Sequence, residues 1–477
     1  MTSSTAAGQT LEELGPRVQA AGQGHLLAFA HELSADDKAA LARELSAIDW
    51  DALPGVISRY RTAGAAEAMG DLEPPVVCCI NGTTGDVAVD ADAARAAGLD
   101  LIRSGKVAAL TVAGGQGTRL GFDGPKGTLP IGPASGRTLF EVFADQISAA
   151  SAWAGRPIPW LVMTSPQNHE QTLAFFEERD WLGLEREQLR FFQQGVMPSF
   201  CPESKRLLLA SKGSLATNPD GHGGVVRALI RSGELERLEN EGVEHLSYFQ
   251  VDNPLVPPLD PVFLGAHAGA GGAPSSGEFS SKMVAKASAS EKVGVFARSG
   301  GRTRVVEYSD LPQELSEATM DSGRLKFEAG SVAIHAASVA FLRSIDEAGE
   351  DALPFHRAFK KVPHLDDKGN LVEPSEPNAV KLERFVFDAI PVARQSLVLR
   401  VDREREFAPT KNPSGVDSVE SARVMQSERA AQWLRSRGLD APKGCTMELG
   451  GAAAWADAAG LEHRPAAEPR EGTSVVL

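Results

Sequence analysis

The stretch that decides the fold is Val107-Ala-Ala-Leu-Thr-Val-Ala-Gly-Gly-Gln-Gly-Thr-Arg-Leu-Gly121, followed by Phe-Asp-Gly-Pro-Lys126-Gly127. Its first seven residues are mostly apolar, which predicts a buried β-strand over residues 107–113. The glycines that follow let backbone N–H groups approach a ligand with no Cβ in the way, as a polyphosphate nest requires. The stretch therefore predicts a strand that runs into a phosphate-binding loop.

The spacing of this loop differs from the two best-known phosphate loops. Gly115, Gly117 and Gly121 follow the pattern GxGxxxG, one residue longer than the dinucleotide fingerprint, and no Gly-Lys-Ser/Thr completes a P-loop. A dinucleotide-dependent dehydrogenase is therefore disfavoured. Arg119 and Lys126 are two cations that suit a triphosphate whose charge must be neutralised as pyrophosphate leaves. A tight turn with solvated basic residues is the plainer alternative, and the Pro-Lys-Gly continuation argues against it.

Outward from this loop, short apolar runs alternate with amphipathic stretches. Such alternation predicts an α/β fold with a doubly wound, mostly parallel sheet of Rossmann-like type. The glycine-rich residues 265–277 are expected to form a flexible loop, with a strand meander after it. The expected strands are residues 107–113, 160–164, 189–193, 246–251, 281–286, 293–297 and 304–308, and the expected helices between the first of them are residues 138–149 and 170–178.

The periodicity at the two ends of the chain is helical. Residues 11 to about 66 carry apolar residues at helical spacing, and a capping box from Ser34 to Asp37 predicts a helix start. Residues 418–437 are helical again. We therefore expect a helical N-terminal module over residues 1–95, a central α/β domain over 96–405 and a small C-terminal region over 406–477.

Composition excludes several classes of function. The chain has 477 residues, 42% hydrophobic and 23% charged, which is typical of a globular protein. Lys plus Arg total 48 against 63 for Asp plus Glu, a net charge of −15, so neither nucleic acid nor an anionic membrane is an expected partner. The four cysteines show no CxxC spacing, and no leader-like or membrane-spanning run is present. These features predict a cytoplasmic protein.

The glycine-loop segment Ala113–Gly121, together with Pro125-Lys-Gly127, resembles the signature of the eukaryotic-type UDP-sugar pyrophosphorylases. The resemblance is greatest to the UDP-N-acetylhexosamine (UDP-N-acetylglucosamine) pyrophosphorylase branch. It extends in unbroken order over roughly residues 20 to 415. The segments that carry it further are Phe191–Gly195, Asp220–Gly224, Val251–Asn253, Val305–Ser309, Ala329-Gly330, Pro377–Asp388 and Phe407–Asn412.

This resemblance implies a nucleotidyltransferase core of GT-A-like type that converts UTP and a sugar 1-phosphate into a UDP-sugar and pyrophosphate. Mg²⁺ (or Mn²⁺) is the implied cofactor. By residue-by-residue carry-over, the phosphates would be held by Arg119, Lys126 and Lys411, the nucleotide by Gly114, Gly115, Gln194 and Gly221, the sugar by His222, Glu307, Ser331 and Lys381, and the metal by Asp252.

Position along the expected strands supports two of these assignments. Gln194 and Asp252 each follow an expected strand, and doubly wound sheets bind ligands at the carboxyl ends of their strands. A Gln amide offers both a donor and an acceptor to a base edge, and a carboxylate suits Mg²⁺ between phosphates. Asp388 follows Phe385-Val-Phe and is either a second metal ligand or a structural residue; the sequence leaves both open.

Two departures from the branch pattern concern the sugar. His222 and Ser331 stand where that branch carries asparagines, and both changes remove an amide that could pair with an N-acetyl group. A glucose-1-phosphate uridylyltransferase or a broad-specificity UDP-sugar pyrophosphorylase is therefore the alternative. A noncatalytic UDP-sugar-binding regulator could lose Arg119, Lys126 or Asp252, and their presence favours an enzyme. The preferred sugar, the oligomeric state and the role of the C-terminal region stay open.

Overall fold

The computed structural model describes residues 9–60, 72–80, 84–349 and 352–477. They form two compact units, neither continuous in sequence. The first unit takes the described residues within 1–69, 195–224 and 354–385, and the second takes those within 70–194, 225–353 and 386–477. This division differs from the consecutive segments 1–95, 96–405 and 406–477 expected from the sequence, because each unit gathers its core from distant parts of the chain.

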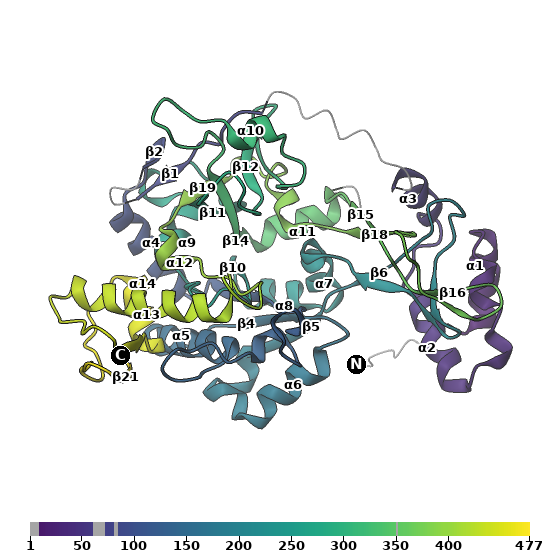
Figure 1. The fold of residues 1–477 in the computed structure, drawn as a ribbon, viewed down its shortest axis with the longest axis horizontal. Coiled ribbons are helices and arrows are strands. Elements are labelled where there is room, and N and C mark those ends of the chain that lie inside the picture. The colour runs from purple at the N-terminus through teal and green to yellow at the C-terminus, as the bar shows by residue number, and fades with distance from the viewer. Residues whose placement is uncertain (1–8, 61–71, 81–83, 350–351) are drawn as a thin grey trace. The chain divides into compact units, whose positions relative to one another are not determined.

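The second unit is built on an 11-stranded sheet, as far as the described residues show. Its strands are β1 (Cys78–Cys79), β2 (Val87–Ala88), β3 (Val107–Val112), β4 (Trp160–Thr164), β5 (Leu189–Gln193), β10 (His245–Gln250), β11 (Phe279–Ala285), β12 (Val295–Ser299), β13 (Arg302–Val306), β14 (Ala329–Ser338) and β19 (Leu397–Arg400). The order along the sheet is β2-β1-β19-β11-β14-β10-β3-β4-β5. Pairing along this path is parallel except where β14 meets β10 and β11. The predicted mostly parallel α/β sheet is confirmed (Figure 1).

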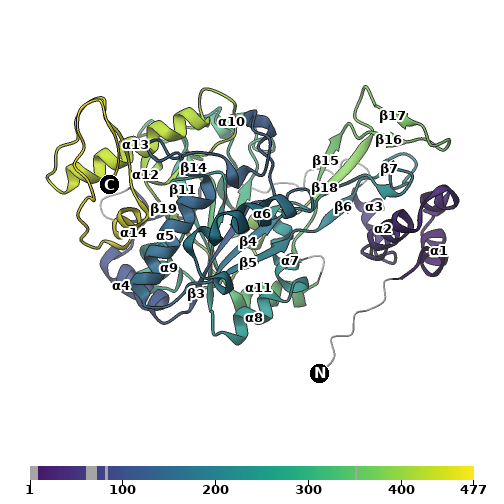
Figure 2. The same ribbon diagram turned by 90° about the horizontal axis from the view of Figure 1, so that it is seen from below.

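The centre of this sheet is the point where the strand order reverses. β3 pairs with β4 on one side and with β10 on the other, although β10 comes much later in the chain. Figure 2 shows β3, β4 and β5 side by side. In doubly wound sheets, ligands bind at the carboxyl ends of strands at such a reversal. The fold therefore places the glycine loop after β3 and Asp252 after β10 at the expected edge.

Two groups of helices accompany the sheet. In one, α4, α5, α9 and α14 contact one another; in the other, α7 and α8 contact α11. The helices of this unit are α4 (Ala91–Arg103), α5 (Leu139–Ala154), α6 (His169–Glu178), α7 (Val225–Arg231), α8 (Glu234–Asn240), α9 (Pro261–His267), α10 (Gln313–Glu317), α11 (Val339–Glu347), α12 (Arg403–Glu406), α13 (Val419–Ser436) and α14 (Gly451–Ala459). Short 3₁₀ turns are η3 (Thr118–Leu120), η4 (Lys126–Thr128), η5 (Asp180–Gly183), η6 (Arg186–Gln188), η8 (Ala270–Gly272) and η10 (Val386–Ala389).

Helices α4 and α9 approach each other closely through two glycines. A Cβ on Gly98 would lie 1.9 Å from the carbonyl oxygen of Pro261, and one on Gly265 would lie 1.8 Å from that of Ala94. The prediction of a flexible loop over residues 265–277 is therefore wrong at its start, because Gly265 is a buried helical contact point. Packing against α4, which the composition does not reveal, determines the conformation at the start of this segment.

The predicted meander after that loop is also wrong in its pairing. The three strands exist, as β11, β12 and β13, but β11 pairs with β14 and with β19. Of these three strands, β12 and β13 form a hairpin, closed by Gly300 and Gly301. Pairing with strands that come later in the chain overrides the local sequence order.

The first unit packs the N-terminal helices against two later segments. Its elements are α1 (Leu11–Ala20), α2 (Ala35–Ser46), α3 (Leu53–Tyr60), η1 (Gly24–Leu27), η2 (Ala30–Glu32), η7 (His222–Gly224), β6 (Val196–Pro198), β7 (Leu209–Ser211), β8 (Ser214–Leu215), β9 (Thr217–Pro219), β15 (His356–Lys360), β16 (His364–Leu365), β17 (Leu371–Val372) and β18 (Ala379–Glu383). Leu41 and Leu45 join one core with Phe200 and Val380. The predicted N-terminal helices are confirmed over residues 11–60, and residues 61–66 lie outside the described part.

The C-terminal residues fold onto the second unit. Helix α13 confirms the predicted helix, and β20 (Thr446–Glu448) pairs in parallel with β21 (Ser474–Val476). Trp433, Met447 and Leu477 share a small core. None of the described helices has the length and hydropathy to cross a membrane.

Candidate active site

The glycine loop lies directly under the amide of Gln194. A Cβ on Gly114 would meet Oε1 of Gln194 at 2.3 Å, so any larger residue would displace this buried amide from its present position. The backbone N–H of Gln194 donates to Thr164 at 2.8 Å, which fixes the amide beyond the end of β4 and β5. A Cβ on Gly115, by contrast, would meet nothing within 4 Å. The structure therefore brings together Gly114 and Gln194, two of the predicted nucleotide-binding residues.

A buried asparagine that sequence reasoning missed holds this loop in place. Nδ2 of Asn168 donates to the carbonyl oxygen of Ala113 at 2.8 Å and to that of Gly115 at 3.3 Å. Its Oδ1 accepts from the backbone N–H of Ser165 at 2.9 Å and from Oγ of Ser165 at 3.1 Å. The amide thus joins the end of β4 to the glycine loop after β3. Its position in a polar run after an expected strand is the only signal that the sequence offered.

The rest of the loop folds back on itself. The N–H of Gly117 donates to Gly124 at 2.9 Å, and Gly121 closes η3 with a φ of 70°, which favours glycine. The N–H of Lys126 then donates to the carbonyl oxygen of Gly115 at 3.0 Å. Arg119, in η3, is exposed and forms no hydrogen bond or ion pair with any described residue. Both predicted cations therefore belong to one compact turn.

Lys126 and Asp252 are connected through Thr410. Nζ of Lys126 donates to the carbonyl oxygen of Thr410 at 3.2 Å. The N–H and Oγ1 of Thr410 donate to the carbonyl oxygen of Asp252 at 2.9 and 3.1 Å. Among the described residues, the carboxylate of Asp252 forms no hydrogen bond or ion pair. The structure thus joins a predicted phosphate ligand to the predicted metal ligand through a residue that the sequence did not single out.

Lys411 follows Thr410 in an exposed position. Its N–H donates to the carbonyl oxygen of Asp417 at 2.7 Å, and its Nζ lies 5.8 Å from the centre of the Phe407 ring. Burial raises the pKa of Asp417, although the charge of Lys411 acts in the opposite direction. Lys411 is therefore placed by a turn of the chain and stays available to solvent and ligand.

Two of the predicted sugar ligands lie around Gly294. The N–H of Ser331 donates to the carbonyl oxygen of Gly294 at 2.8 Å. A Cβ on Gly294 would lie 3.2 Å from Oε1 of Glu307. Ser331 is near the start of β14, which is antiparallel to β10, so it lies at the same edge of the sheet as Asp252. The structure therefore groups Glu307 and Ser331. Asp388 lies in η10, which contacts β13, the strand that ends directly before Glu307.

The remaining predicted residues belong to the first unit. Gly221 has a φ of 84°, and a Cβ there would lie 2.3 Å from the carbonyl oxygen of Arg384. The ring of His222 stacks on Phe385 at 5.3 Å, and Phe385 stacks on His356 at 4.4 Å. Burial, and then His356, lower the pKa of His222 to about 4. At neutral pH this histidine is therefore uncharged, with one ring nitrogen a donor and the other an acceptor.

Lys381, the last predicted sugar ligand, lies in β18. It is half-buried and pairs across the strands with Ala358 of β15. It is three residues from Arg384, whose N–H donates to the carbonyl oxygen of Asp220 at 2.7 Å. Lys381 and the turn that carries His222 are thus attached to the same strand end.

Comparison with known proteins places these features in a family context. A family model described as UTP–glucose-1-phosphate uridylyltransferase matches residues 89–447. The UDP-N-acetylglucosamine pyrophosphorylase of Saccharomyces cerevisiae is 37% identical over 362 residues, which cover 74% of this chain and 74% of the yeast protein. The UDP-N-acetylhexosamine pyrophosphorylase-like protein 1 of Xenopus tropicalis is 35% identical over 445 residues, covering 90% of this chain and 84% of the relative.

Solved structures show the same likeness. The uridine diphosphate N-acetylglucosamine pyrophosphorylase of Trypanosoma brucei superposes with a TM-score of 0.76 at 26% identity, covering 94% of this chain and 93% of that one. A UDP-glucose phosphorylase of the same organism has a TM-score of 0.58 at 18% identity and covers 90% of this chain and 85% of that one, which shows likeness of fold.

Proposed function

The chain belongs to the UTP–glucose-1-phosphate uridylyltransferase family, and we propose that it joins UTP to a sugar 1-phosphate, releasing pyrophosphate. Relatives named UDP-N-acetylglucosamine pyrophosphorylase or diphosphorylase support N-acetylglucosamine 1-phosphate as its first substrate. The observation that carries the proposal is the convergence of the glycine loop, Gln194, Lys126 and Asp252 at the carboxyl edge of one sheet. The four cysteines are free, which fits a reducing cytoplasm.

The chemistry asks the protein to position and neutralise charge. A phosphate oxygen of the sugar 1-phosphate forms a new bond to the α-phosphorus of UTP. The bond from that phosphorus to the bridging oxygen breaks on the opposite side, and pyrophosphate carries the electron pair away. No protein nucleophile is required, so the gain comes from orientation and from fixed positive charge near the departing group.

The residues divide this work between them. Gln194 sits over the glycine loop, where its amide can donate to and accept from the edge of a uracil ring. Lys126, tethered through Thr410, and exposed Arg119 and Lys411 supply the positive charge for the phosphates. A purine would meet the fixed amide of Gln194 with a different edge and a larger ring. We therefore expect UTP to be strongly preferred over ATP.

A divalent cation fits the site only if the substrate shares in holding it. The described residues contain no group of three or more His, Cys, Asp or Glu side chains that could hold a metal ion alone. The carboxylate of Asp252 has no partner among them, and Mg²⁺ commonly uses one or two carboxylates together with substrate phosphates. We propose that Asp252 binds Mg²⁺ (or Mn²⁺), which when bound neutralises phosphate charge. Asp388 as a second ligand remains an alternative.

We propose that selection among sugar 1-phosphates is less strict than the relatives' names suggest. His222 is neutral and presents one donor and one acceptor on separate ring atoms, whereas an asparagine amide carries both at one end. Ser331 is shorter than asparagine by a whole amide. A site that pairs with an N-acetyl group rejects sugars without one because its own polar groups are left unpaired. Glucose 1-phosphate should therefore react within about tenfold of the N-acetyl sugar.

The experiment offers the purified chain each of the two sugar 1-phosphates with UTP or ATP and Mg²⁺, and follows pyrophosphate release. Turnover with UTP and N-acetylglucosamine 1-phosphate supports the proposal. Tight binding of the UDP-sugar without turnover would identify a noncatalytic regulator instead. Equal rates with UTP and ATP would contradict the role given to Gln194.

A further inference from the structure

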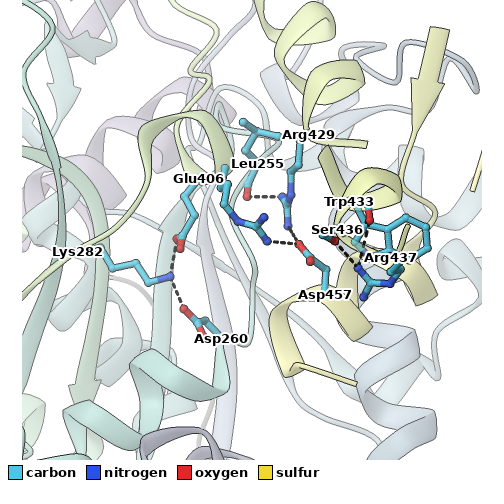
Figure 3. A network of polar contacts seen from close by, with 10 residues as sticks. Leu255, Asp260, Lys282, Glu406, Arg429, Trp433, Ser436, Arg437 and Asp457 are labelled. Carbon is cyan, nitrogen blue, oxygen red and sulfur yellow. Dashed lines mark hydrogen bonds and ion pairs between the residues drawn. The ribbon is translucent and has the colours of Figure 1, made fainter. Parts of the chain in front are cut away.

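A buried lysine joins two distant carboxylates inside the second unit. The side chain of Lys282, in β11, is 0% exposed, and its Nζ lies 2.5 Å from Oδ2 of Asp260 and 2.5 Å from Oε2 of Glu406 (Figure 3). Burial alone would lower the pKa of Lys282, but the two carboxylates raise it. Lys282 therefore stays charged and fixes α12, which ends at Glu406, to the sheet.

A second buried cation reaches the same region from the C-terminal helix α13. Nη1 of Arg429 donates to the carbonyl oxygen of Leu255 at 3.0 Å, and its Nη2 lies 3.5 Å from Oδ2 of Asp457 in α14. The same carboxylate accepts from Nη2 of Arg405 at 2.7 Å. Arg429 and Asp457 thus hold two chain segments at once, one three residues after Asp252 and one next to Glu406 (Figure 3).

Hydrogen bonds connect this network to residues 406–411, the segment that carries Lys411. Nδ2 of Asn253 donates to the carbonyl oxygen of Glu406 at 2.7 Å, and its Oδ1 accepts from the N–H of Ala408 at 2.9 Å. Thr410 then bonds to Asp252 and accepts from Lys126, as described above. Residues 252–255 and 405–410 are therefore cross-linked along their length, and Arg429 anchors both outer ends.

The network differs from an ordinary surface ion pair in its burial. The side chains of Arg429 and Asp457 are 8% and 9% exposed. Loss of the guanidinium would leave the carbonyl oxygen of Leu255 without this donor. Asp457 would keep Arg405 as its one ion-pair partner among the described residues. Buried polar groups deprived of a partner favour local rearrangement. The segment most free to rearrange is the exposed turn that carries Lys411.

We propose that Arg429 is a positioning residue for the uridylyl transfer. Through Leu255 and through Asp457 and Arg405, it fixes the placement of Asp252 relative to the segment that carries Thr410 and Lys411. This gives the C-terminal helices α13 and α14 a part in catalysis, although none of the predicted substrate ligands lies in them. The inference rests on the proposed function for its kinetic consequence and on the geometry alone for its structural one.

The test compares Arg429→Met with Arg437→Met. Arg437 follows the same helix and lies 4.2 Å over Trp433. Its hydrogen bonds to described residues are with Trp433 and Ser436. Amide hydrogen exchange of residues 406–412 is measured without ligand, and kcat and KM are measured with UTP and N-acetylglucosamine 1-phosphate. Arg429→Met should raise exchange at Ala408 and Thr410 and lower kcat, each by about tenfold, while Arg437→Met changes neither.

The outcomes separate positioning from simple stabilisation. If Arg429→Met lowers the melting temperature but leaves exchange of residues 406–412 and kcat per folded molecule unchanged, the proposal is wrong. Should this variant fail to fold, Arg405→Gln serves instead, because Arg405 is partly exposed and, among the described side chains, pairs with Asp457. Arg429→Lys should recover part of kcat. If the parent protein makes no UDP-sugar, the proposed function fails while the exchange result still tests the network.

Discussion

Replacement of Asn168 by alanine tests how the glycine loop is held. The side chain is fully buried and makes two hydrogen bonds to carbonyl oxygens of residues 113 and 115 and two with Ser165. Asn168→Ala removes all four. The carbonyl oxygen of Ala113 and the N–H of Ser165 would then be buried without these partners.

The expected loss of stability follows from the two shorter bonds. A neutral hydrogen bond contributes about 1 kcal/mol net, and a buried group left unpaired costs about 1–3 kcal/mol. Bonds of 2.8 Å to Ala113 and 2.9 Å from Ser165 therefore predict a decrease in the free energy of unfolding of about 2–4 kcal/mol. A loop released from this tether must be ordered again when UTP binds. An ordering cost of about 1.4 kcal/mol would raise the dissociation constant for UTP about tenfold.

Urea unfolding gives the stability and isothermal titration calorimetry gives the dissociation constant for UTP. Gln167→Ala is the matched control, because that neighbouring side chain is exposed and forms no hydrogen bond or ion pair with a described residue. We expect the control to match the parent within about 0.5 kcal/mol. An Asn168→Ala variant as stable as the control, with unchanged UTP affinity, would refute the reasoning.

Three further predictions concern UTP binding, a buried histidine of the core and sugar selection. Gly114→Ala should weaken UTP binding by about tenfold or more, because its Cβ displaces the amide of Gln194, while Gly115→Ala leaves that amide in place; calorimetry showing equal losses would contradict this. Burial lowers the pKa of His267 from 6.5 to about 3, so the unfolded chain binds a proton there that the folded chain does not. The free energy of unfolding should therefore fall by up to ~1.4 kcal/mol per pH unit below pH 6.5. Urea titrations should show a smaller slope for His267→Gln. An unchanged slope in this variant would disprove the assignment of the pH dependence to His267. His222→Asn should raise the preference for N-acetylglucosamine 1-phosphate over glucose 1-phosphate, and a ratio of kcat/KM values unchanged from the parent would remove His222 from sugar selection.

The core of the fold could be predicted because its strands are buried on both faces. Short, mostly apolar runs at residues 107–113, 160–164 and 189–193 correspond to β3, β4 and β5 with shifts of at most one residue. Gly265 shows where such reasoning fails. The composition of residues 265–277 is typical of a loop, but the close contact with α4 that requires glycine at position 265 exists only in the folded chain. The two-unit division was not predicted for the same reason, since Val380 completes a core begun by Leu41.

The candidate site likewise contains residues that the sequence could predict and residues that it could not. Gln194 and Asp252 could be placed because strand ends in a parallel sheet share an edge. Thr410 and Asn168 act through hydrogen bonds to residues far away in the sequence, and Thr410 is 284 positions from Lys126. Such partners follow from chain crossings that periodicity does not encode. The C-terminal Arg429 is a further case, since only the folded chain brings it to Leu255.

The most direct test of the account follows the α-phosphate of UTP. UTP labelled with ³²P at the α-position is incubated with N-acetylglucosamine 1-phosphate and Mg²⁺, using the parent chain and the variants Lys126→Ala and Arg119→Ala. The account predicts that the label appears in the UDP-sugar and unlabelled pyrophosphate is released, with each variant slower by about tenfold or more while its fold is preserved. Label that stays in UTP with the parent chain, or folded variants that react as fast as the parent, would contradict it.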